Sequence, residues 1–252
     1  MNLIILSDQN FFNLLLLVLT ELHTTLQVVL VNNLEELNQI GDDLKNQSRL
    51  LSIFSAEIVP YDTLKQFGFG CYNLHPGSNE YPGWRAWSFA IMNNSDHFGL
   101  TLHEMTERVD EGAIIHMQKI PRDSKSTEQE FISSVGNFVH EFFKSFPDFF
   151  LPQERLPPID LNWTGVKFRK KDVQDMIKVD QSININLLIA VIRAFGFGYR
   201  GEKPFILRSD KKYILGPSYE GKYSVTDRIT IHGFNFWAED FLIQQKMIAS
   251  TS

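Results

Sequence analysis

The sequence predicts an α/β fold in which a mainly parallel sheet has helices on both faces, a Rossmann-like arrangement. Short apolar runs alternate with helix-forming segments over the first 120 residues. This alternation is typical of parallel strands joined by crossover helices. Polar turns follow three of the apolar runs, at residues 7–10, 55–57 and 75–83. Ligands in such folds bind beyond the carboxyl ends of the strands, so we expect these turns to converge on one cleft.

The expected elements follow from apolar runs and from helical periodicity. The expected strands are residues 2–6, Leu26–Val31, Leu50–Phe54, Gly70–Leu74, Phe98–Met105 and Ala113–Ile120. The expected helices are Phe11–Leu22, Leu34–Asn46, Tyr61–Phe67, Trp84–Met92 and Asn137–Phe150. Aromatic residues at helical spacing in the last of these, such as Phe138 and Phe142, indicate packing against the sheet.

A proline-rich segment predicts a boundary after residue 150. Leu151-Pro152 is followed by Leu156-Pro157-Pro158, and such clusters interrupt regular structure. We therefore expect one large domain over residues 1–150 and a small α+β region over residues 151–252. The expected features of the second part are a basic run at Lys167–Lys171, a helix at Ile183–Phe195 and a β-hairpin at Lys203–Ile214 that turns at Ser209-Asp210.

Composition excludes several classes of function. The net charge is −6 and the isoelectric point is near 5.6, so the chain lacks the broad basic surface of a protein that grips tRNA or DNA. A single cysteine, Cys71, excludes an internal disulfide framework and a cysteine-based zinc site, and we expect no metal. The turn at residues 7–10 lacks the Gly-x-Gly-x-x-Gly pattern of a dinucleotide site.

The N-terminal residues give no sign of a targeting or membrane segment. Lys and Arg are absent from the start, and polar residues interrupt the first two apolar runs. No segment approaches the roughly 20 apolar residues that a membrane helix needs. We therefore expect a cytoplasmic protein that has no membrane partner.

The stretch Tyr72–Ile115 contains the candidate catalytic residues. Asn73 and His75 are two residues apart on a predicted strand, so their side chains point to the same side. An Asn amide can donate to an oxyanion, and a His can move a proton near neutral pH. Asp110 could orient that His and raise its basicity. The three predict acyl transfer without a covalent intermediate, although His75 taken singly is better explained as a hydrogen-bonded structural residue.

This stretch resembles the folate-dependent formyltransferases. The shared positions are Asn73, His75, Pro76, Tyr81, Gly83, Asp110 and Gly112. The run Gly99–His103, with Met105 and Arg108, is most similar to the members that formylate nucleotide-linked amino sugars. Many members have Ser-Leu-Leu-Pro before the Tyr, whereas this chain has Gly77-Ser78-Asn79-Glu80, so its acceptor loop differs. Outside residues 50–120 the resemblance is weaker, although Ile192-Arg193-Ala194 and the basic run, a strand in the family, also match.

The resemblance implies N10-formyltetrahydrofolate as the formyl donor. Asn73 would donate to the tetrahedral oxyanion, and His75 would share that task or take the amine proton. Asp110 would hold His75 through a water. The implied folate contacts are Ile58, Arg108, Val109 and Asp110. The candidate contacts to the phosphates and base of the acceptor are Gln9, Asn10, Arg85 and Tyr199, and Arg85 could equally be a solvated helix residue.

The expected acceptor is a dTDP-linked amino-dideoxy sugar for bacterial surface polysaccharide, such as the O-antigen of lipopolysaccharide. The acidic balance, the short C-terminal region and the Thr101-Leu102-His103 pattern favour it. Residues 1–150 would then be the catalytic domain, and residues 151–252 would serve acceptor recognition, homodimerisation or both. The alternatives are methionyl-tRNA formylation, which an acidic chain fits poorly, formyltetrahydrofolate hydrolysis, and non-catalytic folate or nucleotide binding.

Overall fold

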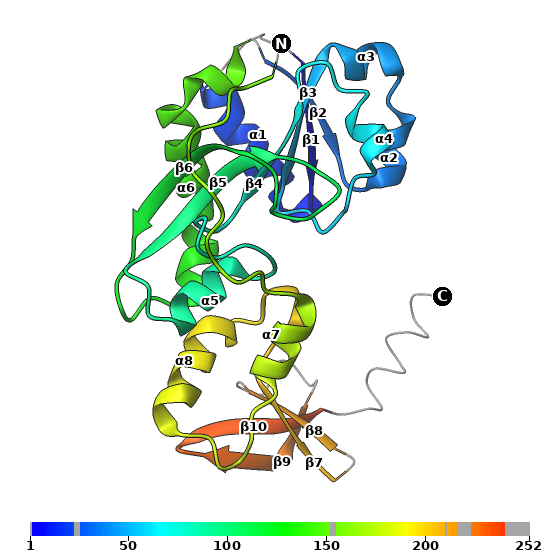
Figure 1. Ribbon diagram of the computed structural model, residues 1–252. Coiled ribbons are helices and arrows are strands. Elements are labelled where there is room, and N and C mark those ends of the chain that lie inside the picture. The colour runs from blue at the N-terminus through cyan, green and yellow to red at the C-terminus, as the bar shows by residue number, and fades with distance from the viewer. Residues whose placement is uncertain (1, 23–25, 152–154, 210, 216–222, 240–252) are drawn as a thin grey trace.

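The computed structural model describes residues 2–22, 26–151, 155–209, 211–215 and 223–239 (Figure 1). Two sheets lie at opposite ends of the molecule. The N-terminal sheet has six strands in the order β2-β1-β3-β4-β5-β6, and the C-terminal sheet has four in the order β7-β8-β10-β9. The predicted α/β fold with a small C-terminal α+β region is confirmed.

All six expected strands form close to their predicted places. They are β1 (Asn2–Ser7), β2 (Gln27–Val31), β3 (Ser48–Ile53), β4 (Cys71–His75), β5 (His97–Glu104) and β6 (Ile114–Pro121). The pairs β1–β2, β1–β3 and β3–β4 are parallel, whereas β4–β5 and β5–β6 are antiparallel. The antiparallel step brings the end of β4 beside the residues that precede Asp110.

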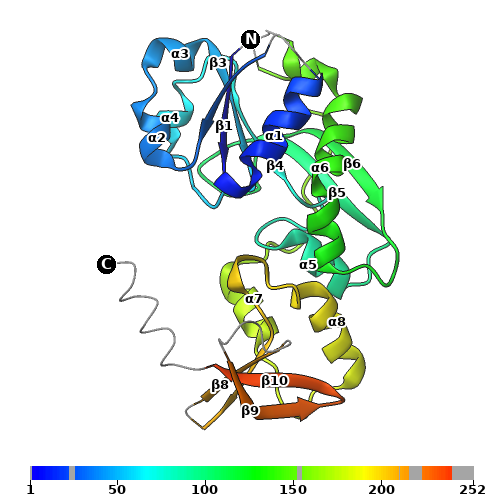
Figure 2. The same ribbon diagram turned by 180° about the vertical axis from the view of Figure 1, so that it is seen from behind.

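Helices cover both faces of the six-stranded sheet (Figure 2). On one face lie α1 (Gln9–Leu22) and α6 (Glu128–Ser145), and on the other lie α2 (Leu34–Gln39), α3 (Asp42–Asn46) and α4 (Tyr61–Leu64). Side chains alternate along a strand, so each face of the sheet has its own hydrophobic core. Leu3 and Ile5 belong to the core that includes Leu15 of α1, and Ile4 and Leu6 belong to the core that includes Leu37 of α2. Within the described residues, no helix has both the length and the apolar character needed to cross a bilayer.

Two helices differ from the prediction for local reasons. The single helix expected at Leu34–Asn46 is divided into α2 and α3, because Ile40 and Gly41 adopt extended backbone angles between them. The helix expected at Asn137–Phe150 begins earlier, at Glu128, because Thr127 and Glu130 form a capping box. It ends at Ser145, and residues Pro147–Phe150 form the short 3₁₀-helix η1.

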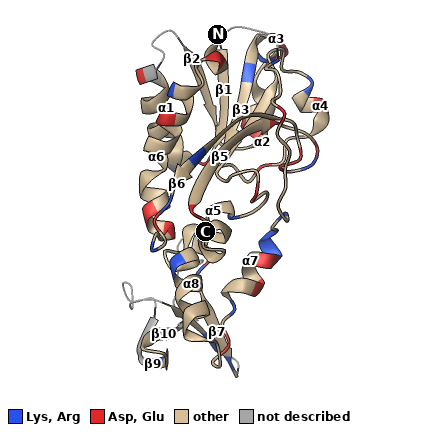
Figure 3. Ribbon diagram, turned by 60° about the vertical axis from the view of Figure 1, so that its left-hand side comes forward, with Lys and Arg blue, Asp and Glu red and all other residues tan. Residues whose placement is uncertain are grey.

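The C-terminal part is more extensive than the sequence predicted. The described residues include α7 (Lys170–Ile177), α8 (Ile185–Phe195), η2 (Tyr199–Gly201), β7 (Phe205–Arg208), β8 (Lys211–Leu215), β9 (Tyr223–Ile231) and β10 (Phe234–Glu239). Strands β7 and β8 form the expected hairpin, whose predicted turn residue Asp210 lies outside the described residues. The end of the basic run opens α7 instead of forming a strand, and acidic residues follow it on the same helix (Figure 3).

Gly83 allows the loop after β4 to pack closely against the chain beyond residue 160. Its φ is +98°, and a Cβ atom there would lie 2.1 Å from the Phe168 carbonyl oxygen. We expect Gly83→Ala to lower the free energy of unfolding by about 1–3 kcal/mol, because alanine is strained at this positive φ and its Cβ would overlap the Phe168 carbonyl oxygen. Chemical denaturation measures this. The control Gly41→Ala meets nothing within 4 Å and should cost about 1 kcal/mol or less. Equal losses in the two variants would contradict the prediction.

Candidate active site

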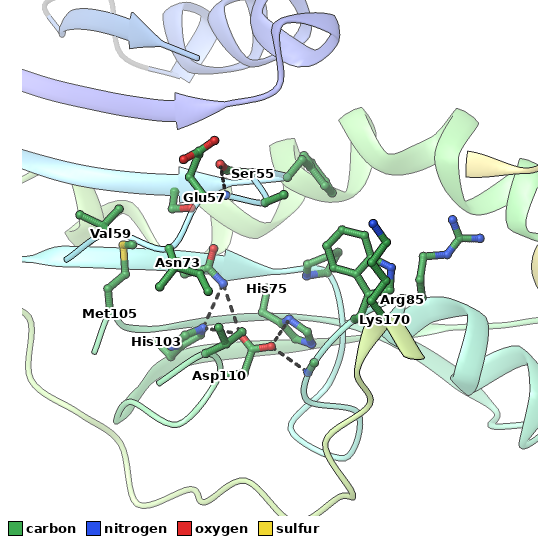
Figure 4. Close-up of a pocket in the computed structure, with 18 of the residues that line it drawn as sticks. Ser55, Glu57, Val59, Asn73, His75, Arg85, His103, Met105, Asp110 and Lys170 are labelled. Atoms are coloured by element: carbon green, nitrogen blue, oxygen red, sulfur yellow. Dashed lines mark hydrogen bonds and ion pairs between the residues drawn. The ribbon is translucent and has the colours of Figure 1, made fainter. Parts of the chain in front are cut away.

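A cavity of about 530 Å³ opens at the carboxyl ends of β3 and β4. Its lining includes residues of the loop after β3, the end of β4 and the segment from His103 to Asp110. The C-terminal part contributes Lys170, Tyr199 and Arg200. In Figure 4, Asn73, His75, His103 and Asp110 lie between Val59 and Met105 at one end and Arg85 and Lys170 at the other.

Asp110 is the centre of the polar cluster in this cavity. One carboxylate oxygen, Oδ2, lies 3.2 Å from His75 Nδ1 and accepts a hydrogen bond from the Gly83 backbone N–H at 2.7 Å. The other, Oδ1, lies 3.1 Å from His103 Nε2 and 3.5 Å from the Asn73 amide nitrogen. Asp110 therefore contacts His75 directly, where the family resemblance implied a bridging water.

The charge state of Asp110 follows from these contacts. Burial opposes ionisation, but His75, His103 and the Gly83 N–H more than offset it, and they hold the pKa of Asp110 well below its ordinary value. The residue also has a left-handed backbone φ of +49°, a conformation that is uncommon outside glycine. Asp110 is thus an ionised carboxylate that the fold holds in an unusual backbone conformation between two imidazoles.

His75 is almost fully enclosed, with an exposed fraction of 3%. Its Nε2 lies 2.8 Å from the Tyr81 carbonyl oxygen, so both ring nitrogens face oxygen acceptors. Burial lowers the pKa of His75 below its ordinary value, and Asp110 and the Tyr81 carbonyl oppose this effect only in part. His75 is therefore neutral near pH 7 and can accept a proton, and the resulting imidazolium could donate to both oxygens.

His103 also belongs to the cluster, although its sequence position did not predict it as a site residue. It lies directly opposite Asn73 in the antiparallel pairing of β4 and β5. Its Nε2 is 3.0 Å from the Asn73 amide nitrogen, and its Nδ1 is 2.8 Å from the Glu104 carbonyl oxygen. The signal that could have revealed it is the register of the two strands, which the sequence alone does not give.

The four residues predicted to contact folate all belong to the lining of the cavity. They are Ile58, Arg108, Val109 and Asp110. The exposed fractions of Ile58 and Val109 are 60% and 47%, which is high for apolar side chains beside a cavity. The Arg108 side chain is largely exposed and lies 3.4 Å from Glu111. These residues therefore present exposed apolar surface, from Ile58 and Val109, and one exposed positive charge on the long Arg108 side chain.

The residues predicted to contact the acceptor are dispersed. Tyr199 and Arg85 line the cavity, whereas Gln9 is exposed at the start of α1 and is not part of the lining. The side chain of Asn10 lies outside the described part of the structure. Arg85 is 3% exposed, so it is not a solvated helix residue. Its guanidinium forms an ion pair with Glu128 and donates to the Tyr199 carbonyl at 2.7 Å.

Metal ligation has no support in the described ranges. Among those residues there is no group of three or more His, Cys, Asp and Glu side chains arranged to hold a metal ion. The one cysteine, Cys71, is buried, and burial raises the pKa of its thiol above its ordinary range. The cavity lining holds two imidazoles, a carboxylate and an amide in mutual contact.

Comparison with known proteins matches this site to one family. Residues 31–145 match the family model described as formyl transferase. A methionyl-tRNA formyltransferase of Ehrlichia canis is 27% identical over 175 residues, which cover 68% of this chain and 54% of that protein. The chain therefore spans about half the length of this curated relative.

Two solved structures share the fold over most of the chain. One is a 4-N formyltransferase from Francisella tularensis, with a TM-score of 0.66 and 20% identity, covering 82% of this chain and 93% of that one. The other is WlaRD, a sugar 3N-formyl transferase crystallised in the presence of dTDP and 5-N-formyl-THF. It has a TM-score of 0.59 and 19% identity, and covers 95% of this chain and 97% of that one.

Residues 31–145 are similar to the formyl transferase family model, and they lie within the part of the chain that forms a sheet of the α/β class. The predicted resemblance to the folate-dependent formyltransferases is confirmed, and sugar N-formyltransferases are among the structural neighbours.

Proposed function

We propose that this protein transfers the formyl group of N10-formyltetrahydrofolate to the amine of a nucleotide-linked amino sugar. One observation supports this most directly. Inside the cavity, His75, His103 and Asn73 all lie within 3.5 Å of one ionised carboxylate, that of Asp110. An amide donor and a neutral imidazole are the groups that an amine needs to attack a formyl carbon without a covalent enzyme intermediate.

The reaction exchanges one carbon–nitrogen bond for another. The acceptor amine attacks the formyl carbon, and the carbonyl oxygen becomes an oxyanion. Asn73 donates a hydrogen bond to that oxyanion. Its amide nitrogen has two hydrogens, so the other can remain hydrogen-bonded to Asp110 or His103. Neutral His75 accepts the proton that the amine loses, and the Asp110 carboxylate stabilises the imidazolium. The bond from carbon to N10 then breaks, and the proton passes to N10.

The two ends of the cavity suit the two substrates. Ile58 and Val109 expose apolar surface that the pterin and aminobenzoyl rings would cover. At the opposite end, Trp84 and Tyr199 offer aromatic surface, and Lys170 and Arg200 offer positive charge. Because nucleotide sugars combine a planar base with a diphosphate, this end fits such an acceptor. The neighbour crystallised with dTDP and 5-N-formyl-THF supports the same pair of ligands.

Several finer assignments belong to the proposal and await tests of their own. They are a dTDP-linked acceptor, a role in bacterial surface polysaccharide, a homodimer and a cytoplasmic location. The division into a catalytic domain at residues 1–150 and a C-terminal region at 151–252 is also a prediction. Lys170, Tyr199 and Arg200 would give the second region a part in acceptor recognition.

The first test is formyl transfer from N10-formyltetrahydrofolate to a panel of dTDP- and UDP-linked amino sugars. Initiator methionyl-tRNA and a reaction without acceptor run beside them. We expect turnover only with an amino sugar. Transfer to the tRNA would favour the activity named for the Ehrlichia canis relative, and equal folate release without acceptor would identify a hydrolase. Binding of folate or nucleotide without any turnover would identify a non-catalytic binding protein.

Lys170 provides a test of the acceptor end. It is exposed at the start of α7 and lines the cavity. We expect Lys170→Ala to raise KM for the nucleotide sugar about tenfold with little change in kcat, because a charge-assisted contact to phosphate acts on binding. The matched control is Lys171→Ala, which alters the next residue outside the lining. A fall in kcat alone, or an equal effect of both variants, would contradict the assignment.

A further inference from the structure

The segment from residue 159 to 168 returns from the predicted boundary to the active-site loops. The Ile159 N–H donates to the Ile114 carbonyl at 2.8 Å. The Asn79 side chain donates to the Asn162 carbonyl at 2.8 Å, and the Thr164 N–H donates to the Asn79 carbonyl at 3.0 Å. These bonds tie the segment to β6 and to the loop that follows His75.

Trp163 lies at the middle of this segment and touches both histidines of the cluster. Its ring meets that of His75 edge to face, with centroids 5.5 Å apart and an angle of 80°. It meets His103 in the same manner at 5.2 Å and 83°. Its Nε1–H donates to the Gly112 carbonyl oxygen at 3.0 Å, in the loop that contains Asp110. One indole thus contacts both imidazoles that flank the carboxylate.

These contacts have two physical effects. Edge-to-face pairs between rings favour one orientation over free rotation, so the indole limits how far either imidazole can turn away from Asp110. The imidazoles are 3% and 2% exposed, and the indole supplies part of the apolar surface that encloses them. Trp163 does not line the cavity, so it would act on the substrate only through the histidines.

We propose that Trp163 is a positioning residue of the active site, which holds His75 and His103 on Asp110 and keeps water from them. This inference rests on the proposed function for its catalytic meaning. Its structural content, the orientation and enclosure of the two histidines, does not depend on which acceptor is used. It also makes the segment beyond the predicted boundary part of the catalytic machinery.

Removal of the indole has a definite effect on the titration of His75. The titratable groups that face His75 are Asp110 and His103, and the Tyr81 carbonyl is the remaining polar neighbour. All three stay in the variant, while burial, the largest cause of the low pKa, is reduced. The pKa of His75 therefore rises. If neutral His75 accepts the amine proton, the acid limb of the kcat–pH profile moves to higher pH.

The test compares Trp163→Ala, Trp163→Phe and Val166→Ala. Val166 is in the same segment but 75% exposed, so its variant is the matched control. We measure kcat, KM, the pH profile and the titration of each histidine ring by NMR. For Trp163→Ala we expect at least a tenfold fall in kcat, little change in KM and the upward shift of the acid limb. Trp163→Phe keeps an aromatic ring and should restore most of kcat, and Val166→Ala should match the wild type.

The outcomes separate this inference from the proposed function. NMR titration requires no turnover, so a raised His75 pKa in Trp163→Ala supports the positioning role even if no acceptor is formylated. An unchanged titration and an unchanged kcat would overturn it, as would a loss that Trp163→Phe does not relieve. If Trp163→Ala fails to fold, Trp163→Leu keeps apolar volume without the ring contacts. An unchanged kcat in that variant would also overturn the inference.

Discussion

Replacement of Asn73 by alanine is expected to lower kcat by about 10²–10³, the loss typical of removing one oxyanion donor. The Asn73 amide nitrogen is at the end of β4, within 3.0 Å of His103 and 3.5 Å of Asp110, and the residue lines the cavity. Asn73 supplies the side-chain amide of the cluster formed with His75, His103 and Asp110. KM for both substrates should change little, because the donor acts on charge that forms only in the transition state.

The measurement is steady-state formyl transfer with the acceptor that the panel identifies. Asn93→Ala is the control, since Asn93 has a similar side chain but is exposed at the end of α5 (Ala86–Met92). The two variants should have matching unfolding midpoints. If Asn73→Ala raised KM without lowering kcat, Asn73 would be a binding residue and another group would stabilise the oxyanion.

Replacement of Glu128 by glutamine is expected to destabilise the fold by about 3–5 kcal/mol, the usual cost of breaking a buried ion pair. Glu128 and Arg85 have side chains that are 0% and 1% exposed, and they contact each other directly. Glu128 also accepts from the Gly198 N–H at 3.2 Å. The pair joins α6 to the start of α5 and to the residues beside Tyr199. Loss of the carboxylate leaves the Arg85 charge buried, with Glu202 at 3.5 Å as its remaining acidic neighbour among the described residues.

Urea denaturation at pH 8 measures this effect. Burial raises the pKa of Glu128 to about 7, although Arg85 opposes the shift, so the wild-type pair is ionised at pH 8. The control Glu141→Gln removes an exposed carboxylate from the same helix and should change stability by less than about 1 kcal/mol. The double variant Arg85→Met/Glu128→Leu should recover much of the loss. Equal losses from Glu128→Gln and Glu141→Gln would show that the pair contributes nothing specific.

Local sequence signals predicted most of the N-terminal sheet and part of the site. The strands of the N-terminal sheet are short apolar runs, and their signal is independent of what packs on them. Asn73 and His75 share one side of β4 because successive side chains on a strand point to opposite faces, so residues two apart point to the same face. The start of α6 also has a local signal, because Thr127 and Glu130 form a capping box, whereas aromatic spacing alone predicts only the later part of the helix.

The C-terminal sheet was predicted less completely. The hairpin of β7 and β8 has a local turn, whereas β10 pairs with β8 across a long stretch of chain. Such pairing depends on contacts between distant segments, which a single sequence does not reveal. The basic run was expected as a strand because of the family resemblance. Its Lys170 and Lys171 open α7, and only Phe168 makes an isolated bridge, to Gly83.

The sequence by itself determined the α/β class, the strand that presents Asn73 and His75, and the family to which the motif is similar. Only the tertiary structure brought His103 to Asn73, Trp163 to both histidines and Glu128 to Arg85. The physical reason is distance along the chain. Periodicity and spacing report neighbours within a few residues, whereas these contacts form only when separate elements pack together and exclude water from the groups between them.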